Sequence, residues 1–176
     1  MGLDELNADD AMKLADTLMR CDRWSAAVAL LEEHADLVEG DYSLSWTLGW
    51  AHFKQEHFVE ACRFLRRATL LAPQEPVGHW AFGVACHSLG EFDQAEASLL
   101  QALRIGDSAM ARLELALVYM HQGRSAEAEQ VHLDGVRLSP KSAKQWVAYA
   151  AFLSDKGRVT EAEEAYAKAH SLPRGS

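Results

Sequence analysis

Eight histidines and three cysteines are the side chains of this sequence with the most evident capacity for chemistry. Histidine and thiolate are the usual zinc ligands, yet the sequence contains no HExxH motif and no Cys/His pairs at zinc-finger spacing. His79 and Cys86 are spaced to share one face of a helix. We expect these two residues, together with His52, to be buried between helices rather than to bind a metal.

Nucleophilic and acid–base catalysis have equally little support. The GxSxG, P-loop and dinucleotide-binding motifs are missing from the sequence. Cys62 follows a small residue and is expected to pack as a small hydrophobic residue. The acidic pairs at 32–33 and 163–164 are expected on solvated helix faces. We therefore expect a non-enzymatic protein without catalytic residues, cofactor or metal.

Composition narrows the class of protein further. The 176 residues carry a formal charge of −9, whereas a nucleic-acid-binding face is basic. No apolar run approaches the roughly 18 residues of a membrane span, and the N-terminus lacks the layout of a secretory signal. Three cysteines without a CxxC motif are typical of free thiols in a reducing compartment. We expect a soluble, cytoplasmic protein that neither binds nucleic acid nor spans a membrane.

A repeated spacing of small residues organises almost the whole chain. One small residue recurs at intervals of 33 or 34, and a second follows it by twelve. They are Ala15, Gly49, Gly83, Ala116 and Ala150 at the first position and Ala27, Ala61, Ala95, Ala128 and Ala162 at the second. Small residues at fixed points allow helices to approach closely, so the spacing predicts two packed helices per repeat.

The helix pairs predicted from this spacing cover residues 8–38, 42–71, 76–105, 109–138 and 143–171, joined by linkers short enough to force antiparallel neighbours. Gly90, Gly123 and Gly157 stand where a helix takes its left-handed C-terminal residue. Ser142 and Gln145 form the S-x-x-Q pattern of a capping box at the start of the last pair.

The recurring residues resemble the pattern of tetratricopeptide repeat (TPR) proteins, which runs Trp, Leu, Gly, Tyr in the first helix and Ala, Phe, Ala, Pro in the second. The clearest matches are Leu48, Gly49, Ala61, Ala68 and Pro73; then Phe82, Gly83, Phe92, Ala95 and Ala102; then Leu115, Ala116, Tyr119, Ala128 and Pro140; and then Trp146, Ala162, Tyr166 and Ala169. The fourth repeat departs from the pattern at Arg112 and Gly135. The resemblance implies an all-α, right-handed superhelical TPR solenoid of about five helix-turn-helix repeats.

On this basis the chain divides into five repeats and two tails. We expect an N-terminal tail at 1–7, a degenerate first repeat at 8–41, further repeats at 42–75, 76–108, 109–142 and 143–172, and a C-terminal tail at 173–176. The last five residues, LPRGS, are similar to the remnant of an engineered protease site.

The resemblance also implies that first helices line a concave face that binds partners. The residues expected there are Met12, Trp46, Trp50, Trp80, Val84, Leu113 and Leu117. Together they predict an unusually apolar, aromatic-rich groove, since an exposed helix face is normally polar. Trp46 and Trp80 each lie one place after the family's packing position, so a rotation that turns both rings into the seam between helices is an alternative. Another alternative is that this apolar face is covered by a second copy of the chain or by the chain's own N-terminal segment.

The same positions exclude the best-known TPR ligand. A clamp for a C-terminal carboxylate needs Lys and Asn on successive first helices, and the matching positions hold Met12, Asp16, Thr47, Val77 and Ala81 instead. We therefore expect a protein-binding adaptor or scaffold whose groove takes an apolar or amphipathic peptide segment. The alternative is a dedicated chaperone of an apolar client, similar to the TPR chaperones of type III secretion.

Overall fold

The computed structural model describes residues 6–173, and this part of the chain is folded into eleven α-helices without a β-strand. The predicted tails at 1–7 and 173–176 fall partly on residues 1–5 and 174–176, which lie outside the described residues. The chain forms two compact units, Met1–Gly106 and Asp107–Ser176, here called the N-terminal and C-terminal units. Each unit is described by itself.

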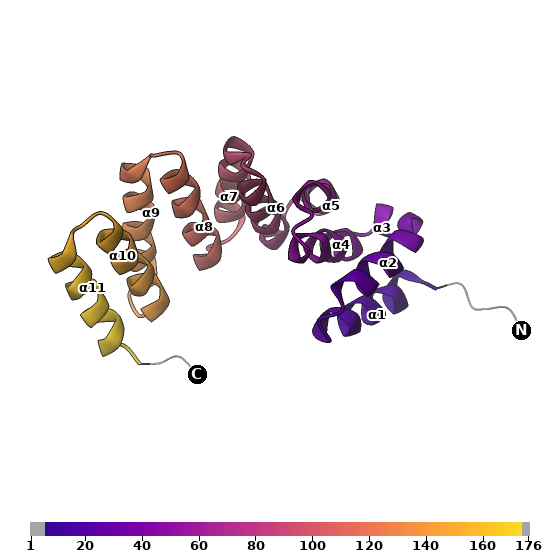
Figure 1. Ribbon diagram of the computed structural model, residues 1–176, viewed down its shortest axis with the longest axis horizontal. Coiled ribbons are helices and arrows are strands. Elements are labelled where there is room, and N and C mark those ends of the chain that lie inside the picture. The colour runs from indigo at the N-terminus through magenta and orange to yellow at the C-terminus, as the bar shows by residue number, and fades with distance from the viewer. Residues whose placement is uncertain (1–5, 174–176) are drawn as a thin grey trace, which may run out of the picture. The chain divides into compact units, whose positions relative to one another are not determined.

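The helices of the two units follow one another with short connections (Figure 1). The N-terminal unit holds α1 (Ala8–Arg20), α2 (Trp24–Glu33), α3 (Ala35–Gly40), α4 (Tyr42–Lys54), α5 (Phe58–Leu71), α6 (Pro76–Leu89) and α7 (Phe92–Ile105). The C-terminal unit holds α8 (Ala109–His121), α9 (Ser125–Leu138), α10 (Ala143–Asp155) and α11 (Val159–Ser171). Consecutive helices pack against each other as α1–α2, α4–α5, α6–α7, α8–α9 and α10–α11.

Small residues make this packing close, as predicted. The ten small positions are all buried. At Gly83 the approach is so tight that a Cβ atom would lie 2.7 Å from Cγ of Leu99, on the partner helix α7. A Cβ atom at Gly49 would lie at the same distance from Cγ of Leu65, on α5. Helix packing therefore excludes even a methyl group at Gly49 and Gly83 unless a fully buried leucine moves.

The turns inside the helix pairs use two kinds of residue. Gly90, Gly123 and Gly157 have φ angles of 86°, 74° and 72°, the left-handed conformation predicted for them. The corresponding turns after α1 and α4 place Asp22 and Glu56 in the same conformation, at φ 59° and 62°. A side chain in this region costs about 1 kcal/mol, so these two turns store backbone strain.

The second helix of the first pair differs from its prediction. The spacing predicts an unbroken helix to residue 38, but α2 ends at Glu33 and a short α3 follows after His34. His34 leaves the helical conformation with φ −112° and ψ 46°, and its Nδ1 forms a 2.9 Å hydrogen bond with the carbonyl oxygen of Leu30. The side chain thus competes for a carbonyl that the helix would otherwise use. After this break α3 packs Val38 into the core.

The capping box predicted at the start of α10 is wrong. Ser142 occupies the N-cap position but makes no side-chain capping hydrogen bond, and Gln145 is 1% exposed. Its Oε1 takes the space that a Cβ of Gly135 would need, and Nε of the buried Arg112 lies 3.6 Å from the position of that Cβ. Arg112 also pairs with Asp107. Gly135 and Arg112, the two departures from the family pattern, are therefore adjacent, because the missing side chain makes room for buried polar groups.

Candidate functional site

An aromatic patch lies on α4 and α6 of the N-terminal unit, each of which is the first helix of its helix pair. Trp46, Trp50 and Phe53 follow one face of α4, since residues three or four apart share a helix face, and Trp80 joins them from α6. Trp50 is the centre of the patch. Its ring centroid lies 5.8 Å from that of Trp46, 4.9 Å from that of Phe53 and 5.4 Å from that of Trp80. These spacings are those of stacked or tilted aromatic pairs.

Each ring of the aromatic patch is half-buried, with one part in contact with its neighbours and another part accessible. The Nε1 atom of Trp46 is buried and has no hydrogen-bond partner among residues 6–173. The indole rings therefore serve the packing between α4 and α6 and also form a surface. Half-burial fits either alternative for Trp46 and Trp80, so their placement in a binding groove or in the helix seam stays a prediction.

Phe53 is a patch residue that sequence reasoning missed. It carries no family signature, but it follows Trp50 by three residues on the same helix face. Its ring also lies 5.6 Å from that of Phe58 at the start of α5. The helical spacing from Trp50 is the signal that would have found it.

Two of the expected groove residues are placed mainly in the packing. Val84 is 9% exposed and belongs to the buried side of α6. Met12 is half-buried and packs against the core formed by α1, α2, α3 and α4. Its Sδ accepts a 3.4 Å hydrogen bond from Oγ1 of the buried Thr47. Val84 therefore contributes little to the surface of the first helices, whereas Met12 is only partly accessible.

Leu113 and Leu117 line an apolar cavity of about 420 Å³ in the C-terminal unit. Leu117 is 49% exposed, whereas Leu113 and the three expected groove tryptophans are half-buried. The remaining lining residues come from α8, α9 and α10 and are Met120, His132, Ala148, Ala151, Phe152 and Asp155. The lining is therefore largely apolar, with aliphatic side chains from α8 and α10 and the rings of His132 and Phe152.

His132 is the one ionisable side chain buried in the wall of this cavity. Its ring lies 5.2 Å from that of Phe152 and 6.2 Å from that of Tyr149. Burial lowers its pKa to about 4, against a smaller opposing effect of the Glu129 carboxylate. The imidazole is consequently neutral near pH 7, which keeps this wall apolar.

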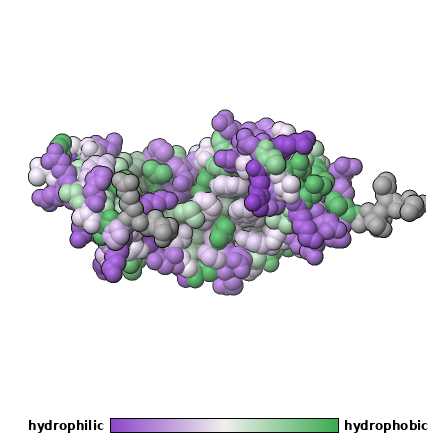
Figure 2. All heavy atoms as spheres, turned by 90° about the horizontal axis from the view of Figure 1, so that it is seen from below, coloured by the Kyte–Doolittle hydropathy of each residue, from purple (hydrophilic) through white to green (hydrophobic). Residues whose placement is uncertain are grey.

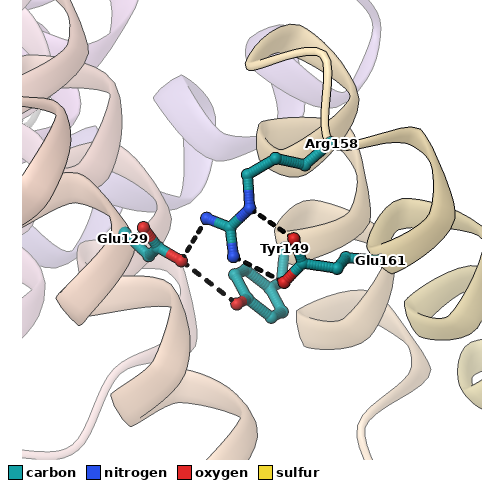
Figure 3. A network of polar contacts seen from close by, with 4 residues as sticks. All are labelled: Glu129, Tyr149, Arg158 and Glu161. Carbon is teal, nitrogen blue, oxygen red and sulfur yellow. Dashed lines mark hydrogen bonds and ion pairs between the residues drawn. The ribbon is translucent and has the colours of Figure 1, made fainter.

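A polar network stands beside the cavity and fixes α9, α10 and α11 together (Figure 3). The Arg158 guanidinium lies 2.5 Å from the Glu129 carboxylate and 2.6 Å from that of Glu161. The Tyr149 hydroxyl donates a 3.4 Å hydrogen bond to the same Glu129 oxygen. Burial and the negative charge of Glu129 raise the pKa of Tyr149. The network joins three helices around Glu129 and holds the Tyr149 ring against His132.

The rest of the surface is mixed. On the face drawn in Figure 2, hydrophobic side chains emerge in separate patches among hydrophilic ones.

Within residues 6–173, no group of three His, Cys, Asp or Glu side chains is arranged to hold a metal ion. None of the described helices is long and apolar enough to cross a membrane. His52 lies 3.3 Å from the Glu32 carboxylate, and His79 bonds the Pro73 carbonyl at 3.0 Å.

Comparisons with known proteins bear on the fold. Residues 87–143 match the family model described as tetratricopeptide repeat. No curated protein matches the sequence. A crystal structure of MamA is similar with a TM-score of 0.76 and 18% identity, covering 88% of this chain and 91% of that chain.

Two further solved structures give the same result. MamA from Desulfovibrio magneticus RS-1 has a TM-score of 0.78 and 17% identity, covering 94% of each chain. A thermophilic TPR protein from Thermus thermophilus has a TM-score of 0.72 and 23% identity, covering 92% of this chain and 89% of that chain. At these identities the likeness concerns the fold, and the expected all-α fold is confirmed.

Proposed function

We propose that this chain, which has the tetratricopeptide repeat fold and matches that family's model over residues 87–143, is a non-enzymatic adaptor or scaffold that binds an apolar or amphipathic peptide segment of a protein partner. TPR folds are modules for protein–protein interaction. The observation that carries the proposal is the aromatic patch, three tryptophans and a phenylalanine gathered on α4 and α6 with part of each ring accessible.

Large aromatic side chains are the residues most often found at binding hot spots. They provide much contact area with few rotatable bonds, so little conformational entropy is lost when a ligand covers them. The stacking of Trp50 on Trp46 and Phe53 fixes these rings before any ligand arrives. A pre-organised apolar surface of this kind suits a peptide that inserts one or two large apolar side chains.

The charge of the protein adds to the description of the partner. A formal charge of −9 favours encounter with a segment of net positive charge. The preferred ligand is therefore an amphipathic helix with an apolar stripe and basic flanks. The cavity lined by Leu113 and Leu117 lies within the C-terminal unit and offers a second place where an apolar side chain of a partner can bind.

Selection of peptides by the purified protein tests this proposal. A random 16-residue display library should yield sequences with apolar residues at helical spacing and a surplus of Lys and Arg. In fluorescence anisotropy, Trp80→Ala should weaken binding of a selected peptide at least about tenfold. Trp146→Ala is the matched control, because Trp146 is also a half-buried first-helix tryptophan but bonds the Pro140 carbonyl. Equal binding by wild type and Trp80→Ala would contradict the proposal.

The chaperone alternative is favoured by one observation, the number of exposed apolar side chains on both units, such as Leu70, Leu117 and Leu138. A chaperone's client-binding surface aggregates or self-associates when it is empty. Sedimentation velocity of the purified chain separates the two functions. A stable monomer supports the adaptor function. A concentration-dependent oligomer that dissociates when an apolar peptide is added supports the chaperone function.

A further inference from the structure

Two cysteines that are far apart in the sequence meet between α5 and α6. The Sγ atoms of Cys62 and Cys86 lie 3.8 Å apart. A disulfide has a sulfur–sulfur distance of about 2.05 Å, so each sulfur needs to move by only about 1 Å to bond the other. The third cysteine, Cys21, is exposed at the end of α1 and has no thiol neighbour of this kind.

The two thiols of this pair differ in access. Cys62 is half-buried and lines a cavity of about 650 Å³ in the N-terminal unit. Cys86 is 1% exposed and is not part of the cavity wall. A reagent that enters the cavity therefore meets Cys62 first and reaches Cys86 only through it.

The cavity beside Cys62 is positively charged. Arg63, Arg66 and Arg67 line it, and Glu39 is the only acid among the lining residues. Glu39 is engaged by Arg67, whose guanidinium lies 3.5 Å from its carboxylate. Within residues 6–173 the structure records no ion pair for Arg63 or Arg66. The cavity thus presents two arginines to an anionic ligand, in a protein of net negative charge.

The hydrogen bond between the thiols also separates their acidities. The side-chain hydrogen bond with Cys86 lowers the pKa of Cys62, against the opposing effects of burial and of the Glu91 carboxylate. The same bond, together with burial, raises the pKa of Cys86. The more accessible sulfur is consequently the better nucleophile, and the buried one is suited to react in a second step.

We propose that Cys62 and Cys86 form a thiol–disulfide exchange site whose co-reactant is a low-molecular-weight disulfide bearing carboxylates. This site is separate from the aromatic patch and does not depend on the peptide-binding proposal. Arg63 and Arg66 hold the carboxylates of the co-reactant, and Cys62 is the attacking group.

The exchange proceeds in two balanced steps. The Cys62 thiolate attacks one sulfur of the ligand, a mixed disulfide forms, the ligand's own sulfur–sulfur bond breaks, and the released thiolate takes up the proton that Cys62 gave to water. Cys86 then bonds the Cys62 sulfur and displaces the second ligand thiolate, which takes up the Cys86 proton. Two protein thiols are oxidised and one disulfide is reduced to two thiols.

Oxidised glutathione, added to the full-length Cys21→Ser protein, is the direct test. Mass spectrometry should find one intramolecular bond between the peptides that contain residues 62 and 86. The bond closes a loop of the chain, so the melting temperature should rise by at least about 5 °C and return on reduction with dithiothreitol. Failure to form this bond in protein shown to be folded by circular dichroism would overturn the proposal.

Single variants identify the order of attack. In the Cys21→Ser protein, Cys86→Ser should stop at the mixed disulfide and retain one glutathione on Cys62, whereas Cys62→Ser should retain none. Both substitutions are close in size to cysteine, so the melting temperatures of the reduced variants provide the check on folding. Glutathione retained on Cys86 instead of Cys62 would contradict the assigned roles.

The charge preference is tested with three disulfides of different charge. The disulfides are the anionic oxidised glutathione, the neutral hydroxyethyl disulfide and the cationic cystamine. For each of them, the rate of reaction with the protein is divided by the rate of its reaction with free N-acetylcysteine amide, which corrects for the intrinsic reactivity of the disulfide. At low salt the normalised rate should be at least about threefold higher for glutathione than for cystamine. The paired substitution Arg63→Gln and Arg66→Gln should abolish this difference. A preference for cystamine, or no preference, would overturn the assignment of an anionic co-reactant.

Discussion

The first-helix faces of the two units are apolar in different ways. In the N-terminal unit the large side chains contact one another, because Trp50 is within 6 Å of three other rings. In the C-terminal unit they surround a space of about 420 Å³ lined by Leu113, Leu117 and their neighbours. The same repeat therefore yields a pre-organised aromatic surface in one unit and a largely apolar cavity in the other.

The close packing of helices differs between the units in the same sense. The N-terminal unit has glycine at the contact positions of α4 and α6, where a Cβ atom would collide with a buried leucine. The C-terminal unit has Ala116 and Ala150 at these positions, both buried with their methyl groups. The difference predicts that substitutions are most costly at the glycine positions of the N-terminal unit.

Gly83→Leu should give the largest effect, a loss of about 3 kcal/mol or more in the free energy of unfolding, because the Cβ atom alone would lie 2.7 Å from Cγ of the fully buried Leu99. Urea denaturation followed by circular dichroism measures it. Gly40→Ala is the control, since a Cβ there meets nothing within 4 Å. Equal stability of the two variants would show that the helices of the N-terminal unit are not close-packed at this point.

Lowering the pH should destabilise the C-terminal unit through His132. Its pKa is about 4 in the folded protein, below the ordinary histidine value of 6.5, so the unfolded chain binds the proton more readily. The stabilising effect of the neutral ring is complete above pH 6.5 and is lost as the pH falls towards 4, by up to about 3 kcal/mol.

Comparison of variants isolates this contribution from other titrating groups. His132→Gln should show a shallower fall in unfolding free energy between pH 6.5 and 4 than the wild type. His170→Gln, at an exposed position of the same unit, should follow the wild type. Parallel curves for wild type and His132→Gln would contradict the assigned pKa.

Trp50→Ala should cost about 2 kcal/mol of stability, because three ring contacts are lost from a half-buried side chain. Leu117→Ala, at a 49% exposed position of the other unit, should cost less than about 0.5 kcal/mol. Thermal denaturation of both variants sharpens the contrast between a surface that packs on itself and one that does not. A larger cost for Leu117→Ala would reverse the comparison.

The smallest effect concerns the turn after α4. Glu56 has a φ angle of 62°, where glycine is unstrained, whereas the turns of the C-terminal unit already have glycine. Glu56→Gly should therefore raise the free energy of unfolding by about 0.5 kcal/mol after the greater flexibility of unfolded glycine is subtracted. Differential scanning calorimetry detects this as a slightly higher melting temperature, and a lower one would show that the turn is unstrained.

Much of the fold was predictable because its signal is local and repeated. Small residues such as Gly83 and Ala95 recur at fixed intervals, and their burial follows from the packing of any two helices. The break at His34 was not predictable, since it depends on the conformation of one residue and one side-chain hydrogen bond. Gln145 was misassigned to a cap because its actual environment is Gly135, on another helix.

The candidate site was predictable only as a face. The helical spacing of Trp46 and Trp50 placed them together, and the repeat length brought Trp80 to the same side. Whether an apolar residue lies on that surface or beneath it depends on the angle at which each helix packs, which a spacing rule does not contain. Val84 and Leu117 occupy equivalent positions in the repeat, yet one is 9% and the other 49% exposed.

The indole signals of the five tryptophans provide the most direct test that the aromatic patch binds the partner. In a ¹H–¹⁵N NMR titration with a selected amphipathic peptide, the Nε1–H signals of Trp46, Trp50 and Trp80 should shift together and saturate at one equivalent. Those of Trp24 and Trp146, which lie outside the patch, should stay in place and serve as internal controls. Saturable shifts of Trp24 or Trp146 with the three patch signals unchanged would contradict the account.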